Sequence, residues 1–298
     1  MSRNTIPFNN SNDDSIKRLN IGCGRHYHPE WTNLDLQSSD PDVICHDVTQ
    51  GVPFSADSFH VVYHSHILEH LSPEQGNELI SECYRVLKPG GILRVVVPDL
   101  EEIVQLYLAM HEQAWKGNDR AQVNYHWMKM ELLDQMVRSQ SGGLMGRYMA
   151  GLTDDKADFV ESRIGSEFEL CRAPDVEPND EKEDGSFWLR LGKGFNHLKM
   201  ATAKRLVKFL MGEKAEAAFE ESLFRGQGEI HRWMYDRYSL RELCYQAGFV
   251  DFEIKSASES QIENYTDFQL DCVEKRVRKP DSLFVECCKP SPAMQASA

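Results

Sequence analysis

This 298-residue sequence has no long apolar run and no CxxC pair of cysteines. No apolar run approaches the ~20 residues needed to span a bilayer, so no membrane partner is expected. The first residues, MSRNTIPFNNSNDD, lack an apolar signal core, which favours a cytoplasmic protein over a secreted one. None of the eight cysteines forms a CxxC pair, which argues against a disulfide or zinc framework and favours a reducing compartment.

Positive charge is also scarce, since 33 Lys and Arg stand against 47 Asp and Glu and the net charge is −14. An acidic surface repels phosphate backbones and anionic membranes. The densest basic stretch, VEKRVRKP at residues 273–280, is interpreted as a solvated loop. We therefore expect a small-molecule partner and no nucleic acid.

Short apolar runs bounded by turn residues predict four strands near the N-terminus, in KRLNIG, TNLDL, DVICHD and FHVVYHS. Ser72 and Pro73 predict the start of a helix over residues 73–87, which KPGG ends. The nearly continuous apolar run in ILRVVVPD predicts a strand buried on both faces. Strands that alternate with helices predict an α/β fold with a parallel sheet.

Helical patterns dominate from Leu100 to about residue 214, and strand patterns return only near the C-terminus. The chain is therefore divided into a flexible segment (1–15), a core (16–99 and 236–298) and a helical insertion (100–235). Residues 173–186 within the insertion are rich in Pro, Gly and acid, which indicates an exposed loop. Ligands of such sheets bind at the carboxyl ends of the strands, so we expect the insertion to cover that edge as a lid.

The stretch RLNIGCGRHYHPEWTNLDL begins like a nucleotide-binding turn but lacks two of its parts. Gly22 and Gly24 permit a tight turn and close approach of a ligand, although an ordinary strand-to-loop turn is the alternative. The third glycine of GxGxxG is absent, and only ten residues separate Gly24 from Asp35, too few for the usual helix. Without that helix there is no N-terminus to hold a diphosphate, which argues against an NAD-dependent oxidoreductase.

Carboxylates follow the next two predicted strands. Asp35 is placed to accept hydrogen bonds from ribose hydroxyls, or it forms a turn. Asp47, in ICHDV, is placed to accept from an adenine amino group. With the glycine turn, these residues predict a site for a nucleoside without a diphosphate.

These segments resemble the class I S-adenosylmethionine-dependent methyltransferases, in particular the methyltransferase type 11 group. The resemblance rests on LNIGCG, NLDL, DVTQGVPFSADSFHVVYHSHILEHL and ECYRVLKPGGILRVVVPDLEEI, and YSLRELCYQAGF matches more weakly. It implies a Rossmann-like sheet of order 3-2-1-4-5-7-6 with strand 7 antiparallel, here with a large helical insertion between strands 5 and 6. It also implies S-adenosylmethionine as the cofactor.

The resemblance assigns the cofactor to residues at the ends of the first four strands: Gly22, Cys23, Gly24, Asp35, Leu36, Asp47, Val48, His64 and Ser65. The glycines would lie beside the methionine part, Asp35 would bind the ribose, and Asp47 with the backbone of Val48 would frame the adenine. The main chain at His64 and Ser65 would approach the amino acid or the sulfonium.

The sequence departs from the family between strands one and two and between strands two and three, where the links are too short for the usual first and second helices. One face of the sheet would then lack its cover. We expect the insertion, the N-terminal segment or a second copy of the chain, in a homo-oligomer, to cover it.

Histidines supply the candidates for a general base, because imidazole titrates near neutral pH and methylation of a hydroxyl releases a proton. His66, His70 and, from a distant segment, His231 are the predicted catalytic residues. A structural role for His70 and Glu69 is the alternative. Histidines four residues apart can also bind zinc, but the resembled family implies no metal at these positions, and none is expected.

Two parts of the insertion supply candidate substrate-binding residues: Arg138, Arg147, Arg232, Trp233 and Tyr235. The first two flank a Gly-Gly break that is either a lid hinge or a plain helix connection. The aromatic residues suit a sugar or ring substrate, or they pack the insertion onto the sheet. The expected function is methyl transfer to a small-molecule or sugar acceptor, at a hydroxyl. An N-methyltransferase and a non-catalytic cofactor-binding protein are the alternatives.

Overall fold

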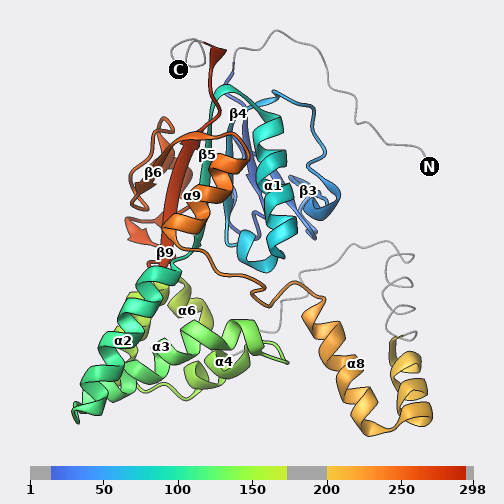
Figure 1. The fold of residues 1–298 in the computed structure, drawn as a ribbon, viewed down its shortest axis with the longest axis vertical. Coiled ribbons are helices and arrows are strands. Elements are labelled where there is room, and N and C mark those ends of the chain that lie inside the picture. Colours follow the sequence, from blue (N-terminus) through green and yellow to red (C-terminus); the bar gives the residue numbers. More distant parts are fainter. Residues whose placement is uncertain (1–14, 173–199, 293–298) are drawn as a thin grey trace.

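A sheet of seven strands forms one end of the molecule and a group of helices forms the other (Figure 1). The computed structural model describes residues 15–172 and 200–292. The predicted loop at residues 173–186 lies outside this range, as does all but the last residue of the predicted flexible segment, 1–15.

The sheet consists of β1 (Arg18–Ile21), β2 (Thr32–Asp35), β3 (Val43–Cys45), β4 (Phe59–Ser65), β5 (Leu87–Pro98), β6 (Val250–Lys255) and β9 (Ser282–Cys288). Their order is β3-β2-β1-β4-β5-β9-β6, and β9 is antiparallel to both of its neighbours. This confirms the predicted strand order. The central strands β4 and β5 are apolar and buried along most of their length, as parallel strands covered on both faces must be.

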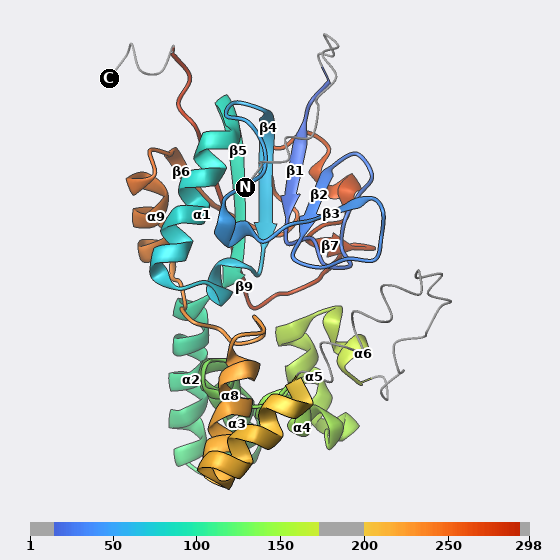
Figure 2. The ribbon, with the colours of Figure 1, turned by 90° about the vertical axis from the view of Figure 1, so that its right-hand side faces the viewer.

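Two helices cover one face of the sheet, α1 (Pro73–Val86) and α9 (Arg237–Gln246) (Figure 2). The start of α1 agrees with the prediction: Ser72 Oγ accepts a hydrogen bond from the Gln75 amide, and the Gln75 side chain accepts one from the Ser72 amide. Leu79, Ile80 and Cys83 then fall on the face that packs against the strands.

The loop that joins β6 to β9, which was not among the predicted covers, packs on the other face. This loop contains η3 (Tyr265–Phe268), β7 (Cys272–Val273) and β8 (Arg276–Val277). Its buried side chains, Ile262, Tyr265, Phe268 and Leu270, pack with Trp31, Tyr63 and Val96. The sequence of this loop has neither helical nor strand periodicity, so it gave no signal that the loop is buried.

Buried charges fasten this loop to the sheet. Arg94 on β5 has no exposed surface; its Nε donates to Asp271 Oδ2 at 2.9 Å and its Nη1 to Glu286 Oε1 at 2.8 Å. The hydroxyls of Tyr63 and Tyr265 donate to the two oxygens of Asp271, at 2.6 and 2.7 Å. The network therefore joins β4, β5 and β9 to the covering loop.

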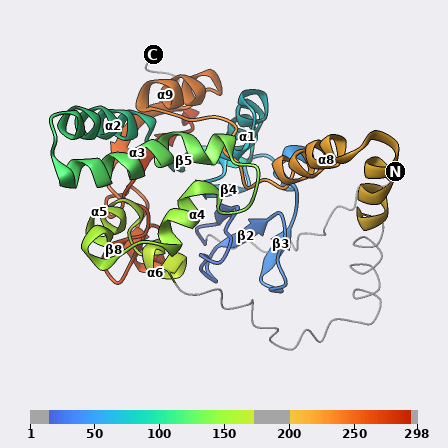
Figure 3. The same cartoon turned by 90° about the horizontal axis from the view of Figure 1, so that it is seen from below.

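The helices between β5 and α9 confirm the predicted helical insertion. They are α2 (Leu100–Trp115), α3 (Asp119–Val137), α4 (Gly143–Ala150), α5 (Asp154–Ile164), α6 (Glu167–Arg172), a helix that includes residues 200–211, and α8 (Glu213–Arg225). Helices α2 to α6 share their own core around Trp127, Met128 and Val160. Figures 2 and 3 show α3 and α4 beneath the carboxyl ends of the strands. Among the described residues, no helix is long and apolar enough to cross a membrane.

Candidate active site

Two cavities lie at the carboxyl ends of the strands, and His66 and His70 line both. The first, which we call the sheet-edge cavity, has a volume of about 460 Å³ and lies between the ends of β1 to β3 and residues 226–228. The second, the insertion cavity, has a volume of about 520 Å³ and lies between the end of β5 and helices α3 and α4. The two cavities meet at the segment that follows β4.

The glycine turn after β1 explains how an acidic residue lies so close to it without an intervening helix. Gly22 and Gly24 have φ angles of +62° and +54°, which favour glycine. The Gly22 and Cys23 amides both donate to the Leu34 carbonyl, at 2.6 and 3.2 Å, and the Gly24 amide donates to Asp35 Oδ2 at 2.8 Å. In an ordinary dinucleotide fold a helix follows this turn. Here the Asp35 carboxylate binds the Gly24 amide instead.

The carboxylates that were predicted to bind the nucleoside lie at the sheet-edge cavity. Asp35 is half-buried, and its two oxygens accept from the amides of Gly24 and Gln37. Asp47 caps the 3-10 helix η1 (Val48–Gln50), where its Oδ1 accepts from the Thr49 amide at 3.0 Å. A carboxylate has about four acceptor sites, so both residues keep acceptor capacity for a ligand.

Only some of the other predicted cofactor residues line the sheet-edge cavity. Gly22, Leu36 and Val48 line the sheet-edge cavity, whereas Cys23, Gly24, His64 and Ser65 do not. The His64 side chain is fully buried, and neither ring nitrogen has a hydrogen-bond partner in the part of the chain that the structure describes. Burial lowers the pKa of His64 to about 4, so its imidazole is neutral at physiological pH.

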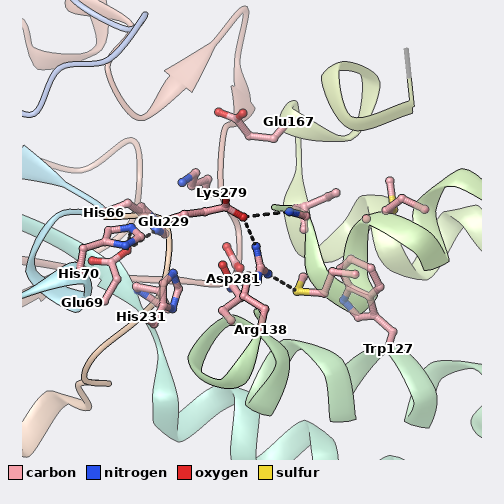
Figure 4. A pocket seen from close by; sticks show the side chains of 17 residues that line it. His66, Glu69, His70, Trp127, Arg138, Glu167, Glu229, His231, Lys279 and Asp281 are labelled. Atoms are coloured by element: carbon pink, nitrogen blue, oxygen red, sulfur yellow. Dashed lines mark hydrogen bonds and ion pairs between the residues drawn. The ribbon is translucent and has the colours of Figure 1, made fainter. Parts of the chain in front are cut away.

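The three predicted catalytic histidines meet around Glu69 (Figure 4). Glu69 and His70 lie on the short helix η2 (Leu68–His70), and Glu69 has no exposed surface. His66 Nδ1 lies 2.9 Å from Glu69 Oε1, and His66 Nε2 lies 2.9 Å from Ser282 Oγ. His231 arrives from the segment before α9, and its ring centre is 4.9 Å from that of His70.

Main-chain hydrogen bonds hold this distant segment in place. The Arg232 and Trp233 amides donate to the Glu69 carbonyl, at 2.7 and 3.2 Å, and the His231 amide donates to the Gln135 carbonyl at 3.0 Å. The fold therefore fixes His231 against η2 on one side and against α3 on the other.

Burial controls the protonation of this cluster. It lowers the pKa of His66 to about 4, with Lys279 adding to the effect, and the pKa of His231 to about 3. Burial alone would raise the pKa of Glu69, but the surrounding imidazoles, that of His66 first, favour its ionised form and hold the pKa well below the ordinary range. At neutral pH the imidazoles of His66 and His231 are therefore neutral beside the Glu69 carboxylate.

The two arginines beside the Gly-Gly break have different surroundings. Arg138 lines the insertion cavity, but its guanidinium is already paired with Asp134 and Glu229, each at 3.1 Å. Glu229 also accepts from the Gly142 amide at 2.9 Å, which ties the break to the segment before His231. Arg147 is exposed and does not line either cavity.

The three remaining predicted substrate residues are not gathered in one place. Arg232 lines the sheet-edge cavity, and Trp233 is half-exposed. Tyr235 is buried in the main core with α1 and α9, and burial raises the pKa of its hydroxyl to about 12. Its carbonyl accepts from the Leu100 amide, so Tyr235 packs the insertion onto the sheet.

Sequence reasoning missed two charged residues of the insertion cavity, Lys279 and Asp281. The interpretation of residues 273–280 as a solvated loop is wrong at its end, because Arg278 is buried and donates to the Leu270 carbonyl and Lys279 faces the cavity. Burial, and next the neighbouring Glu131, raise the pKa of Asp281 to about 7. The sequence did offer one indication that these residues lie at the site, because they come directly before the last strand of the sheet.

Comparison with known protein families shows which part of the chain matches one of them. Residues 26–95 match the family described as methyltransferase domain, of the type 11 group. No curated protein sequence matches. The chain is also similar to a putative methyltransferase of Haloferax volcanii solved with its Trm112 activator (10% identity, 92% of this chain and 83% of that one, TM-score 0.36). A methyltransferase of Archaeoglobus fulgidus gives 12% identity over 93% and 87% of the two chains, with a TM-score of 0.36.

The family match begins just after the glycine turn and spans Asp35 at the end of β2, strand β4, helix α1 and most of β5. The observed strand order with its antiparallel β9 is the one that this family implies. Residues 26–95 thus match a methyltransferase domain of the type 11 group, within a sheet whose strand order is the one that this family implies.

Proposed function

We propose that this protein transfers a methyl group from S-adenosylmethionine to a hydroxyl of a small organic acceptor, such as a sugar or a related ring compound. The cofactor would occupy the sheet-edge cavity and the acceptor the insertion cavity. The observation that carries the proposal is that His66 and His70 line both cavities, so a base at this point can reach the groups that react.

The residues of the sheet-edge cavity fit a nucleoside better than a dinucleotide. Its volume of about 460 Å³ is of the size of ligand pockets, which are about 300–1,000 Å³. The amides of Gly22, Cys23 and Gly24 already donate within the turn, so they form no cradle for a diphosphate. Asp35 keeps free acceptor sites at the rim, where ribose hydroxyls would donate.

The histidine cluster supports proton removal from a hydroxyl. When bound, the cofactor supplies a methyl group on a positively charged sulfur, so alignment is the main task of the protein. His66 Nδ1 faces the Glu69 carboxylate, so Nε2, which lies 2.9 Å from Ser282 Oγ, is the ring atom left to take the hydroxyl proton, directly or through the Ser282 hydroxyl. Glu69 then stabilises the resulting imidazolium, as the carboxylate does in other His–carboxylate pairs. Overall a C–S bond breaks, a C–O bond forms, and the hydroxyl proton passes to His66.

The walls of the insertion cavity suit a modest organic molecule. Trp127, Met145 and Met149 supply apolar surface, and Gln135 and Lys279 supply polar groups. The acidic net charge of −14 disfavours a nucleic acid acceptor. An amine acceptor is the second candidate, because carboxylates of the same cavity, Glu167 and Asp281 among them, would attract a protonated amine.

Calorimetry with S-adenosylhomocysteine and NAD tests the cofactor site. We expect Asp35→Ala to weaken binding of S-adenosylhomocysteine by roughly 1–3 kcal/mol through the lost charge-assisted hydrogen bonds. Asp35→Asn keeps an acceptor for the Gly24 amide and separates the turn from the ribose contact. Asp42→Ala, an exposed carboxylate in the loop before β3, is the control. Equal affinity of Asp35→Ala and the parent protein, or tight binding of NAD alone, contradicts the proposal.

A further inference from the structure

We propose that Glu69, His70 and His231 bind one divalent transition-metal ion, and that zinc is the ion to which they are best suited. One ligand atom from each of the three side chains lies within 4.8 Å of the other two. Glu69 and His70 are adjacent on η2, whereas His231 lies far along the chain, so only the fold brings the set together.

Some buried polar atoms of this group lack a hydrogen-bond partner among the described residues. Glu69 is fully buried; in this part of the chain its Oε2 has no hydrogen-bond partner, and its Oε1 has only the contact with His66 Nδ1 at 2.9 Å. His231 is almost fully buried, with 5% of its surface exposed, and its Nδ1 has no partner. Leaving buried polar atoms unpaired costs folding free energy, which a bound cation would recover.

His70 is oriented as metal-binding histidines commonly are. Its Nδ1 lies 3.1 Å from the carbonyl oxygen of Ile230. A carbonyl can only accept, so Nδ1 carries the hydrogen and the lone pair is on Nε2, which lies 4.0 Å from Glu69 Oε1. Metal-binding histidines usually donate their second ring N–H to a carbonyl or carboxylate in this way. Because Ile230 precedes His231, one segment both orients a ligand and supplies another.

The ligand types decide the class of ion. Two imidazoles and one carboxylate form a common set for catalytic zinc, which keeps a fourth position open, whereas magnesium and calcium prefer oxygen ligands. Zinc bonds of about 2.0–2.2 Å require the three side chains to close slightly around the ion. His66 Nδ1, 2.9 Å from Glu69 Oε1, would fix the carboxylate from behind.

All three ligands line the insertion cavity, so the open position would face the acceptor. A metal held by these residues would lower the pKa of a hydroxyl bound to it and so would ease loss of the proton. This role rests on the proposed function, whereas binding of the ion does not.

Metal titration of the full-length protein, without an affinity tag and stripped with a chelator, tests the proposal. We expect one Zn²⁺ per chain in calorimetry, and visible d–d absorption from one Co²⁺ in the same site. His70→Ala and His231→Ala should each weaken Zn²⁺ binding at least tenfold. His126→Ala removes an exposed histidine of α3, and Cys45→Ser removes an exposed thiol; both should bind as the parent does.

Parent protein that is folded by circular dichroism but binds no stoichiometric Zn²⁺ or Co²⁺ overturns the proposal, whatever the variants do. Equal binding by the parent, His70→Ala and His231→Ala also overturns it, because the ion then lies elsewhere. Binding of S-adenosylhomocysteine, measured on the same samples, separates these outcomes from a failure of the cofactor site.

Discussion

At the scale of single residues, the turn after β1 shows two glycines that are needed for different reasons. Both adopt left-handed φ angles, which cost an L-residue about 1–2 kcal/mol. A Cβ on Gly22 would in addition lie 1.9 Å from Ile67 Cδ1, whereas a Cβ on Gly24 would meet nothing within 4 Å. Conformation alone therefore requires Gly24, and conformation and packing together require Gly22.

Alanine substitutions separate the two reasons. We expect Gly24→Ala to lower the free energy of unfolding by about 1–2 kcal/mol, and Gly22→Ala to lower it further because of the overlap with Ile67. Adding Ile67→Ala should recover part of the loss in Gly22→Ala and none in Gly24→Ala. Urea denaturation measures these values, and equal losses for the two glycines would refute the packing contribution.

His64 makes a pH-dependent contribution to stability. Its pKa is about 4 in the folded protein and near the ordinary 6.5 when unfolded, so the unfolded chain takes up the proton first as the pH falls. Stability is therefore complete above pH 6.5 and is lost towards pH 4, by about 2–3 kcal/mol at pH 4.5. The free energy of unfolding should be measured at pH 7 and pH 4.5. Between these two values, we expect it to fall by about 2–3 kcal/mol less in His64→Leu than in the parent protein. Parallel pH profiles would show that His64 does not titrate in this way.

At the scale of elements, the loop between β6 and β9 replaces helices that the short β1–β2 and β2–β3 links cannot contain. Its aromatic residues fill the sheet face, and Arg94 holds it through Asp271 and Glu286. Removing one partner of a buried ion network leaves charges without compensation, and this is usually more harmful than replacing the whole network.

Arg94→Met tests how strongly this loop is held. We expect a loss of about 3–5 kcal/mol in the free energy of unfolding, because Asp271 and Glu286 stay buried without their cation. The control is Lys116→Ala, which breaks an exposed ion pair with Glu112 and should cost less than about 1 kcal/mol. Hydrogen exchange should show residues 256–278 exposed in Arg94→Met. A loss as small as that of the control would mean that apolar packing alone holds the loop.

At the scale of the whole molecule, the sheet and the insertion each contribute a cavity, and the histidine segment after β4 lies where the two meet. The sheet-edge cavity takes its lining mainly from the strand ends and the insertion cavity mainly from α3, α4 and the loop before β9. Changes in the insertion should therefore affect the acceptor and leave the cofactor untouched.

Gly146→Phe tests this separation. Gly146 lies on α4 at the insertion cavity and has no positive φ, and a Cβ added to it would meet nothing within 4 Å, so the helix accommodates a larger residue. We expect at least a tenfold rise in the acceptor KM and less than a twofold change in affinity for S-adenosylhomocysteine. The control is Ala150→Phe, at the exposed end of the same helix. Equal loss of cofactor affinity in Gly146→Phe would show that the cavities are not independent.

Much of this protein can be predicted from local sequence patterns. The Ser72–Pro73 start of α1, the strand runs and the position of the insertion follow from hydrogen bonding and apolar spacing over a few residues. The family resemblance adds the strand order, which the structure confirms. The rule that ligands bind at the carboxyl ends of the strands directed attention to the segment from His64 to His70.

What only the tertiary structure decided are the contacts between distant parts of the chain. It pairs Arg138 with Glu229, buries Tyr235 in the core, brings Lys279 and Asp281 into a cavity, and covers the sheet with residues 256–278. Local periodicity reports which face of an element is buried but not against what. The packing of the whole chain sets those partners. It also sets the burial that makes His231 neutral and places a ligand atom of His231 within 4.8 Å of one of Glu69.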